Sequence, residues 1–377
     1  MKIAVNTRLL MPDRLEGIGW FTQQIFLRLA QAHPGVQWYF IFDRPPQKGL
    51  QLPANVQPVV LSPPTRHPVL WWLWFHIRLP RLLRKLKVAL FISPDGFLAL
   101  NTPLPQLNVI HDINFEHAPG NIPFTVRLYY RHYFQRYARQ ATRLVTVSQY
   151  SKQDIAHTYA VPPERIDVVY NGVGDFFHTA SANEQSTQRQ QLTGGVPYFI
   201  FIGAFNPRKN IDGMLHAYTR YRREGGQAKF VLVGDKMYWP PAIQKVLDQH
   251  PFKGDLVFPG RLSGKALNQV LAAAQALMFI SHFEGFGIPI IEAFQCEVPV
   301  ITSTTTSMPE VAGEAALLCE PTDYKRITEA MHEVEKEPVR RQLKEAGLKQ
   351  LQKFNWDKAA KEMWQSIQKT LKSCPER

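Results

Sequence analysis

Two carboxylates lie close together in a stretch of sequence whose residue types suit a polar ligand. Glu284 precedes Gly285 and Gly287, and Glu292 follows eight residues after Glu284. Glycines let backbone N–H groups approach a ligand closely, and Pro289 suits the first turn of a helix whose N-terminus attracts anions. Carboxylates are poor phosphate ligands, so we interpret them as acceptors for hydroxyl groups, one on a sugar ring and one on a ribose. The alternative is a strand-to-helix turn whose acids face solvent.

Two adjacent basic residues form the second candidate cluster. Arg208 and Lys209 follow the apolar run 198–202 and the glycine Gly203. The connection between the first strand and the first helix of an α/β unit is where such folds present phosphate sites. A forked guanidinium beside a point charge suits a diphosphate and stabilises negative charge as that group leaves. A basic surface loop is the alternative, because the formal charge of the chain is +13.

Further candidates lie in the first half of the chain. His111 and Asp112 follow the apolar run 107–110, and a His at the end of a buried strand often faces the crevice of a parallel sheet. Asp112 could orient His111 or bind an acceptor, although a lone His is more often structural. Gly17 and Gly19 are not a dinucleotide fingerprint, because no third glycine follows at the required spacing. By themselves they indicate only a flexible loop.

The order of apolar and helical segments predicts what holds these residues. Short apolar runs alternate with helical patterns in the first half, and the alternation restarts near residue 196. Near-continuous apolar strands alternating with helices predict parallel sheets covered on both faces. We therefore predict an α/β chain of two doubly wound, Rossmann-like domains facing each other across a cleft. Ligands should bind beyond the carboxyl ends of the strands.

Composition predicts where these domains begin and end. Residues 1–175 should form the N-terminal domain and residues 196–355 the C-terminal domain. Residues 176–195 are polar, with few large apolar side chains, and predict a linker. Residues 356–377 have the apolar spacing of an amphipathic helix, which we expect to pack back toward the N-terminal domain.

One motif resembles a known family. The sequence E-G-F-G-I-P-I-I-E at residues 284–292 is similar to the paired-glutamate motif of the retaining glycosyltransferases of family 4, which have the GT-B fold. Residues 298–303 and 308–313 match the same family, and the resemblance extends over essentially the whole chain. Cys296-Glu297 departs from the family pattern, which usually has a glycine there. This departure should alter only a surface turn.

The resemblance implies transfer of a sugar from a nucleotide sugar, bound by the second domain, to a hydroxyl of an acceptor bound by the first. It implies retention of configuration without a side-chain nucleophile, the leaving phosphate helping to deprotonate the acceptor. Glu284 would hold hydroxyls of the sugar and Glu292 the ribose. The site residues that it implies are catalytic His111, Arg208, Lys209 and Glu284, donor-binding Gly19, Gly203, Gly285, Phe286, Gly287, Ile288 and Glu292, and Asp112 as an acceptor-binding or orienting residue.

Similar bacterial chains often transfer mannose or a related hexose while building surface polysaccharide. We therefore expect GDP-mannose as donor, with a UDP-sugar as the alternative, and a glycan or lipid-linked glycan as acceptor. We expect no cofactor and no metal, because the sequence has no Asp-x-Asp pattern and no Cys/His cluster. An epimerase or phosphorylase of the same fold, and a non-enzymatic binder of nucleotide sugars or nucleic acid, are the competing interpretations. No helix-turn-helix, RNP-like or zinc signature supports nucleic acid.

Charge and apolar patterning bear on the location of the chain. A positive field favours anionic partners, and residues 67–87 combine tryptophans with arginines and lysines, as at the surface of an anionic membrane. The alternative is a helix that covers the sheet with its apolar face. No signal peptide or run of about 20 apolar residues is present. With unpaired Cys296, Cys319 and Cys374, this predicts a cytoplasmic protein, with peripheral contact to the inner face of the membrane.

Overall fold

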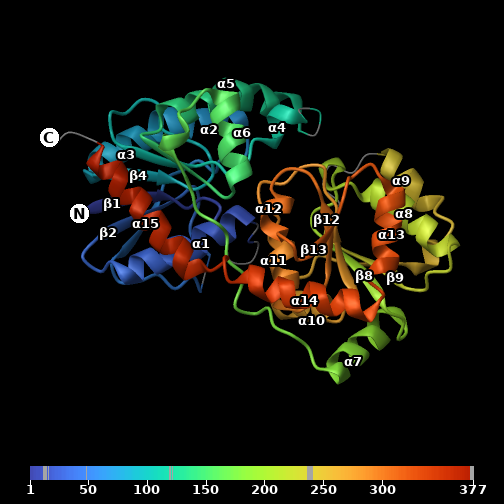
Figure 1. Ribbon diagram of the computed structural model, residues 1–377. Coiled ribbons are helices and arrows are strands. Elements are labelled where there is room, and N and C mark those ends of the chain that lie inside the picture. Colours follow the sequence, from blue (N-terminus) through green and yellow to red (C-terminus); the bar gives the residue numbers. More distant parts are fainter. Residues whose placement is uncertain are drawn as a thin grey trace. The chain divides into compact units, whose positions relative to one another are not determined.

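The computed structural model describes residues 1–11, 15, 17–47, 49–118, 120, 122–235 and 241–373. The chain forms two compact domains, and each is a parallel sheet with helices on both faces (Figure 1). The first domain comprises residues 1–171 and the C-terminal segment from Trp356 onward, and the second comprises Gly172–Asn355. Cys374 and the last residues of the expected C-terminal helix lie outside the described residues.

The sheet of the first domain is wholly parallel, and its described strands follow the order β3-β2-β1-β4-β5-β6-β7. The central strands are almost completely buried, as expected for a sheet covered on both faces. The strands are β1 (Lys2–Asn6), β2 (Gln37–Phe42), β3 (Val56–Val60), β4 (Leu90–Ser93), β5 (Gln106–Val109), β6 (Arg143–Thr146) and β7 (Ile166–Val168).

Helices of the first domain follow its strands in the chain. They are α1 (Gly17–Ala32), α2 (Pro68–Leu73), the π-helical turn η2 (Trp74–Arg78), α3 (Leu79–Leu86), α4 (Asn114–His117), α5 (Phe124–Gln140), α6 (Gln149–Tyr159), the 3-10 turn η4 (Pro163–Arg165) and α15 (Trp356–Lys372). The C-terminal helix α15 packs along α1, where the ring of Trp364 stacks on His33 with centroids 3.6 Å apart (Figure 1).

The helical segment expected at residues 71–86 is interrupted by the turn η2. Pro80 explains the interruption, because proline has no N–H to donate to the carbonyl of His76 and its ring crowds that carbonyl. A wider π-helical turn before Pro80 makes room for the ring. The side-chain amide of Asn101 donates to the His76 carbonyl instead, at 3.0 Å.

The sheet of the second domain is also parallel, and its described strands follow the order β10-β9-β8-β11-β12-β13. The strands are β8 (Tyr198–Ile202), β9 (Lys229–Val233), β10 (Leu256–Gly260), β11 (Ala276–Phe279), β12 (Val300–Ser303) and β13 (Ala316–Cys319). The helices are α7 (Ala182–Thr193), η5 (Pro207–Lys209, 3-10), α8 (Ile211–Arg223), α9 (Pro241–Asp248), η6 (Lys253–Asp255, 3-10), α10 (Gly264–Ala272), α11 (Ile288–Gln295), α12 (Met308–Ala312), α13 (Tyr324–Glu333) and α14 (Glu337–Leu351).

The expected linker at residues 176–195 is largely the helix α7, which contacts α10 of the second domain. Ser181 and Glu184 form a capping box, in which each side chain bonds the backbone N–H of the other residue. The guanidinium of Arg189 donates to the Ala273 carbonyl at 2.8 Å. The prediction was wrong because capping and polar contacts, rather than an apolar face, hold this helix.

No helix in the described part of the chain combines the length and the apolar character needed to cross a membrane.

Candidate functional site

The central pair of strands in the second domain, β8 and β11, marks the topological switch point of its sheet. The chain crosses from β8 toward β9 and β10 on one side and from β11 toward β12 and β13 on the other. In doubly wound sheets, ligands bind in the crevice outside the carboxyl ends of the strands at this point. The predicted basic residues follow β8, and the predicted Glu284 follows β11.

Glu284 lies between the two predicted cations. Its carboxylate is 2.8 Å from the Arg208 guanidinium and 2.6 Å from the Lys209 ammonium. All three side chains are largely buried, and Glu284 is 6% exposed. Burial by itself would raise the pKa of Glu284, but the charges and hydrogen bonds of Arg208 and Lys209 lower it to about 2. Glu284 is therefore ionised, and the three groups together carry one net positive charge.

The loop that carries Glu284 is held in place by hydroxyl side chains that were not among the predicted site residues. The backbone N–H of Glu284 donates to the Thr306 hydroxyl at 3.1 Å, and the Ser307 hydroxyl donates to the Glu284 carbonyl at 2.8 Å. Thr305 donates to the His282 carbonyl at 3.1 Å. The signal in the sequence is the run Ser-Thr-Thr-Thr-Ser at residues 303–307, directly after an apolar strand.

Glycines bring the backbone of neighbouring strands together at the same edge. Gly203 and Gly234 have φ angles of 153° and 151°, which side chains rarely permit. A Cβ atom added to Gly234 would lie 1.9 Å from the carbonyl oxygen of Gly203. Gly203 was predicted and Gly234 was missed, although it directly follows the apolar strand β9. A side chain at Gly234 would collide with the neighbouring backbone, so glycine allows the two strand ends to approach this closely.

The turn into α11 contains the remaining predicted donor-binding residues. Gly287 precedes the helix at a φ of 98°, and Ile288 is its first residue. Gly285 lies in the loop before it. The Phe286 side chain is 4% exposed and packs against the ring of Phe354, with centroids 5.5 Å apart. Phe286 can therefore offer a donor only its backbone, which is a narrower role than the motif suggested.

Glu292 lies one turn into α11 and has a different environment from Glu284. Its carboxyl is half-buried and makes no hydrogen bond or ion pair to another described residue. Burial without a neighbouring cation raises its pKa to about 8. A half-buried carboxyl without a partner is suited to bind a hydroxyl group of a ligand.

His111 lies in the first domain, beyond the carboxyl end of β5. Its Nε2–H donates to the backbone carbonyl of Pro94 at 2.9 Å, and its ring meets the ring of Phe21 edge-on at 5.0 Å. Burial lowers the pKa of His111, while Asp112 and Asp95 partly oppose this. The Asp112 carboxylate accepts the backbone N–H of Asn114 at 3.0 Å and also its side-chain amide. No hydrogen bond joins Asp112 to His111, so the orienting role expected of Asp112 falls to Pro94.

Gly19 does not lie in a loop, because α1 already begins at Gly17. It is buried, and a Cβ atom there would lie 2.8 Å from the carbonyl oxygen of Leu9. Glycine is thus required for close packing of the first turn of α1. The backbone N–H of Gly19 belongs to the helix N-terminus, where such groups are available to anions.

The structure thus groups the predicted residues by domain. In the second domain it brings together Arg208, Lys209 and Glu284 with the glycine turns, and in the first it places His111, Asp112 and Gly19 beyond strand ends. In the part of the chain that the structure describes, no three His, Cys, Asp or Glu side chains meet as metal ligands. The second-domain cluster can bind a phosphorylated group through its net positive charge, and its carboxylates can bind hydroxyls.

Sequence comparison identifies both domains. The family model described as Glycosyl transferases group 1 matches residues 183–350, and Glycosyltransferase Family 4 matches residues 16–175. The O-antigen chain mannosyltransferase B of Escherichia coli is 28% identical over 279 residues, which are 73% of each chain. The O-antigen chain mannosyltransferase RfbU of Salmonella typhimurium is 29% identical over 236 residues, or 62% of each chain. A third match, to the serotype-specific mannosyltransferase WbdA of Escherichia coli, spans 33% of that relative's length.

Solved structures share the fold. The sucrose-phosphate synthase of Thermosynechococcus elongatus superposes with a TM-score of 0.79 at 17% identity, over 99% of this chain and 100% of that one. HepE of Anabaena, in complex with UDP and glucose, gives a TM-score of 0.75 at 16% identity, over 98% of this chain and 99% of that one. The two-domain architecture is therefore the GT-B fold, as the motif at residues 284–292 predicted.

Proposed function

This chain belongs to the family 4 glycosyltransferases, and from this premise we propose that it is a retaining, metal-independent hexosyltransferase. Its donor is GDP-mannose, and its acceptor is a hydroxyl of a glycan or lipid-linked glycan in bacterial surface polysaccharide synthesis. The second domain binds the donor and the first domain binds the acceptor.

The observation that carries this proposal is the cluster of Arg208, Lys209 and Glu284 at the switch point of the second sheet. Its single excess positive charge suits a nucleoside diphosphate, whose phosphates also accept backbone N–H groups at the start of α11. When the phosphates approach the two cations, Glu284 becomes available to the sugar hydroxyls. Glu292 then holds the ribose, for which its solitary, half-buried carboxyl is suited.

The chemistry follows from where charge develops. The bond between the anomeric carbon and the phosphate oxygen breaks, and its electron pair remains on the phosphate. The acceptor oxygen forms the new bond on the same face, and its proton passes to a phosphate oxygen. Arg208 and Lys209 stabilise the charge on the leaving diphosphate, in the role that a metal ion has in other transferases. His111 accepts a hydrogen bond from a sugar hydroxyl at the reacting centre.

Mannose is favoured over other hexoses because the relatives named above are mannosyltransferases. A UDP-sugar is the alternative donor, supported by the complex of HepE with UDP and glucose. An epimerase or phosphorylase of the same fold would convert or cleave its sugar substrate without transfer to a glycan hydroxyl.

A donor panel tests the proposal. We expect slow release of GDP from GDP-mannose, faster with a mannoside acceptor and unchanged by chelator. Lys209→Ala should reduce the rate by about 100- to 1,000-fold, since an electrostatic contact to the developing charge is lost. Lys325→Ala removes an equally charged but exposed side chain on α13 and should leave the rate unchanged. Binding of no nucleoside diphosphate would refute donor binding, and inhibition by chelator would refute the metal-independent route.

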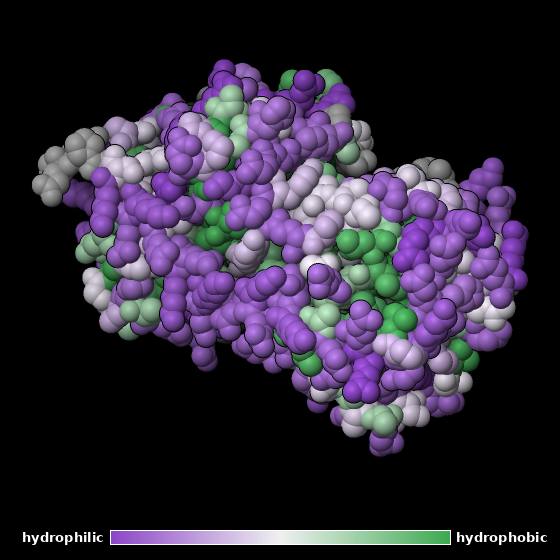
Figure 2. Space-filling model, viewed as in Figure 1, coloured by the Kyte–Doolittle hydropathy of each residue, from purple (hydrophilic) through white to green (hydrophobic). Residues whose placement is uncertain are grey.

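We also propose that the first domain touches an anionic membrane on the cytoplasmic side through α2, α3 and α5. Residues 44–94 and 117–153 contain fourteen Lys and Arg and no Asp or Glu, whereas the rest of the chain has 30 basic and 31 acidic residues. The whole positive excess therefore comes from these two segments. Figure 2 shows a mostly hydrophilic surface on which green apolar atoms emerge over α5.

Apolar side chains accompany this charge. On α2, Val69 is 64% and Trp72 is 44% exposed, and on the adjacent α5, Phe124 is 66% and Leu128 is 63% exposed. Exposed apolar side chains among basic ones are typical of surfaces that bind anionic lipid.

Co-sedimentation with vesicles tests this contact. We expect binding to vesicles that contain phosphatidylglycerol, weaker binding at high salt, and little binding to pure phosphatidylcholine. Trp72→Ala should reduce binding several-fold, as about 1 kcal/mol of apolar contact is lost. Leu348→Ala, at an equally exposed apolar position on α14, is the control and should not change it. Equal binding to both kinds of vesicle would refute an electrostatic contact.

A further inference from the structure

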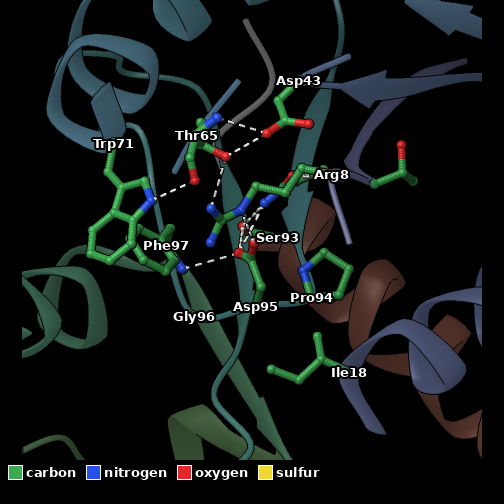
Figure 3. Close-up of polar contacts among 12 residues, drawn as sticks. Arg8, Ile18, Asp43, Thr65, Trp71, Ser93, Pro94, Asp95, Gly96 and Phe97 are labelled. Atoms are coloured by element: carbon green, nitrogen blue, oxygen red, sulfur yellow. Dashed lines mark hydrogen bonds and ion pairs between the residues drawn. The ribbon is translucent and has the colours of Figure 1, made fainter. Parts of the chain in front are cut away.

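The first domain has a switch point of its own, between β1 and β4, and an ion pair bridges it. Arg8 follows β1, Asp95 follows β4, and the Arg8 guanidinium donates to the Asp95 carboxylate (Figure 3). Both are largely buried, at 8% and 9% exposed. Neither residue lies in a motif that is visible in the sequence. The pair occupies the same place in its sheet as Arg208, Lys209 and Glu284 occupy in theirs.

Asp95 is held from several sides. Asn6 donates to its carboxylate at 2.9 Å and Ser93 at 3.0 Å. The Arg8 guanidinium also donates to the Thr65 hydroxyl at 3.0 Å, and its centre lies 4.4 Å from the centroid of the Phe97 ring. An arginine held by a carboxylate, a hydroxyl and an aromatic ring has little freedom to move. The loop after β4 is thereby fixed to the end of β1.

That loop contains the carbonyl that holds His111. Pro94 lies between Ser93 and Asp95, so both of its neighbours belong to this network. Its carbonyl oxygen accepts the His111 Nε2–H at 2.9 Å. A carbonyl can only accept, so Nε2 carries the proton of the neutral ring and Nδ1 carries a lone pair. Among the described residues, none forms a hydrogen bond with Nδ1.

Charges around His111 agree with a neutral ring. Burial lowers the pKa of His111, and the carboxylates of Asp112, on its own loop, and Asp95, on the loop after β4, oppose this only in part. From α1, the neighbour is the uncharged ring of Phe21. His111 is therefore able to accept a hydrogen bond through Nδ1 at neutral pH.

We propose that Arg8 and Asp95 are positioning residues for His111: the pair fixes the Pro94 carbonyl, which selects the Nε2–H tautomer and leaves Nδ1 free to accept a hydroxyl of the sugar substrate. This inference rests on the proposed function, in which His111 serves the reacting centre. It adds a pair of residues that act on the chemistry without touching the substrate.

The tautomer itself can be measured without any substrate. Nitrogen-15 spectra of histidine-labelled protein distinguish the two tautomers, and His111→Gln identifies the His111 signal among the 12 histidines. We expect the Nε2–H form in the unchanged protein and a mixture of tautomers in Asp95→Asn. Since this readout needs no donor, it remains decisive even if the donor proposal fails.

Turnover provides the second measurement. Asp95→Asn should lower kcat by about 10- to 100-fold with little change in the KM for donor, because a displaced catalytic group affects the chemical step. The control is Asp167→Asn, which removes the carboxylate of another, half-buried ion pair of the first domain, with Arg143 on the neighbouring strand. Asp167→Asn should lower thermal stability but not kcat.

Three outcomes would overturn the inference: an unchanged His111 tautomer in Asp95→Asn, an unchanged kcat, or an equal loss of kcat in Asp167→Asn. Should Asp95→Asn not fold, Arg8→Lys keeps the charge but lacks the two separate guanidinium nitrogens that donate to Asp95 and Thr65. It should shift the tautomer in the same direction to a smaller extent. If it leaves the tautomer unchanged, the pair has only a structural role.

Discussion

The two domains place an ion pair at the same point of the same kind of sheet, yet the two points differ in charge and in what fills them. In the second domain, two cations face one carboxylate, and glycine backbones meet without intervening side chains. In the first, one arginine faces one carboxylate, and aromatic and hydroxyl side chains pack around it. The doubly wound fold sets the location. The count of charges and the size of the side chains determine whether that location is suited to bind an anion or to hold a loop.

The largest expected effect comes from filling the glycine contact of the second domain. In Gly234→Ala the new Cβ would meet the backbone carbonyl of Gly203 at 1.9 Å, and the φ of 151° also disfavours alanine. Backbone cannot move aside as a side chain can, so we expect the second domain to lose about 3 kcal/mol or more of unfolding free energy. Chemical denaturation, monitored by hydrogen exchange in each domain, would measure the loss of unfolding free energy.

Two other glycines serve as comparisons for that substitution. In the first domain, Gly96 has a φ of 86°, which also disfavours alanine, but the new Cβ would meet the ring of Phe134 at 2.8 Å, and a ring can shift, so the expected loss is smaller. Gly254→Ala meets no atom within 4 Å and should be nearly neutral. If Gly234→Ala lost no more unfolding free energy than Gly254→Ala, the backbones of Gly203 and Gly234 would not be in close contact in the second domain.

The next effect tests the difference in charge. Glu284→Gln removes the carboxylate between the two cations and should raise the affinity for GDP by roughly 3- to 10-fold, because the net positive charge increases. Turnover should nevertheless fall by about 10- to 100-fold, since the amide is a weaker acceptor for sugar hydroxyls. Calorimetry with GDP and a transfer assay measure the two effects separately. Asp95→Asn is the matching change in the first domain and should not alter the affinity for GDP. An equal rise in GDP affinity in Asp95→Asn would contradict the proposal that the second-domain cluster binds the diphosphate.

The smallest effect concerns pH and stability. Between about pH 4.5 and 8 the unfolded chain ionises Glu292 while the folded chain keeps it protonated, so stability falls as pH rises through this range. Glu292→Gln should remove this pH dependence and be more stable than the unchanged protein at pH 8, by roughly 1–2 kcal/mol because partial exposure to solvent screens the charge. Thermal denaturation at several pH values measures the slope.

A carboxylate of the first domain should show the opposite sign. Burial would raise the pKa of Asp43, but hydrogen bonds from Arg44 and Thr65 lower it. Its contribution to stability is therefore present at neutral pH and is lost as the pH falls through the lowered pKa. Asp43→Asn should be destabilising at pH 7 and less so in acid. If Asp43 and Glu292 changed the unfolding free energy in the same direction as the pH rises, the contrast between a paired and an unpaired carboxyl would be contradicted.

Local patterns in the sequence determined the alternation of strands and helices, the two domains and the residues that we propose bind the donor. Apolar runs such as 198–202 and 276–279 predict buried strands because only a sheet covered on both faces can accommodate them. The motif at residues 284–292 and the basic pair were also evident, because each lies within one strand-to-helix connection. The helix α7 was missed because polar capping, which leaves no apolar period, maintains it.

Only the tertiary structure decided which side chains meet. Arg208 and Glu284 are 76 positions apart in the sequence, and Arg8 and Asp95 are 87 apart; both pairs form because parallel strands end at the same edge. No local pattern distinguishes Arg8 from the other arginines of this basic chain. The same reason explains why Gly234, the hydroxyl run at residues 303–307 and the Pro94 carbonyl were not foreseen. Their roles depend on contacts between connections from different strands, which the order of residues along the chain does not specify.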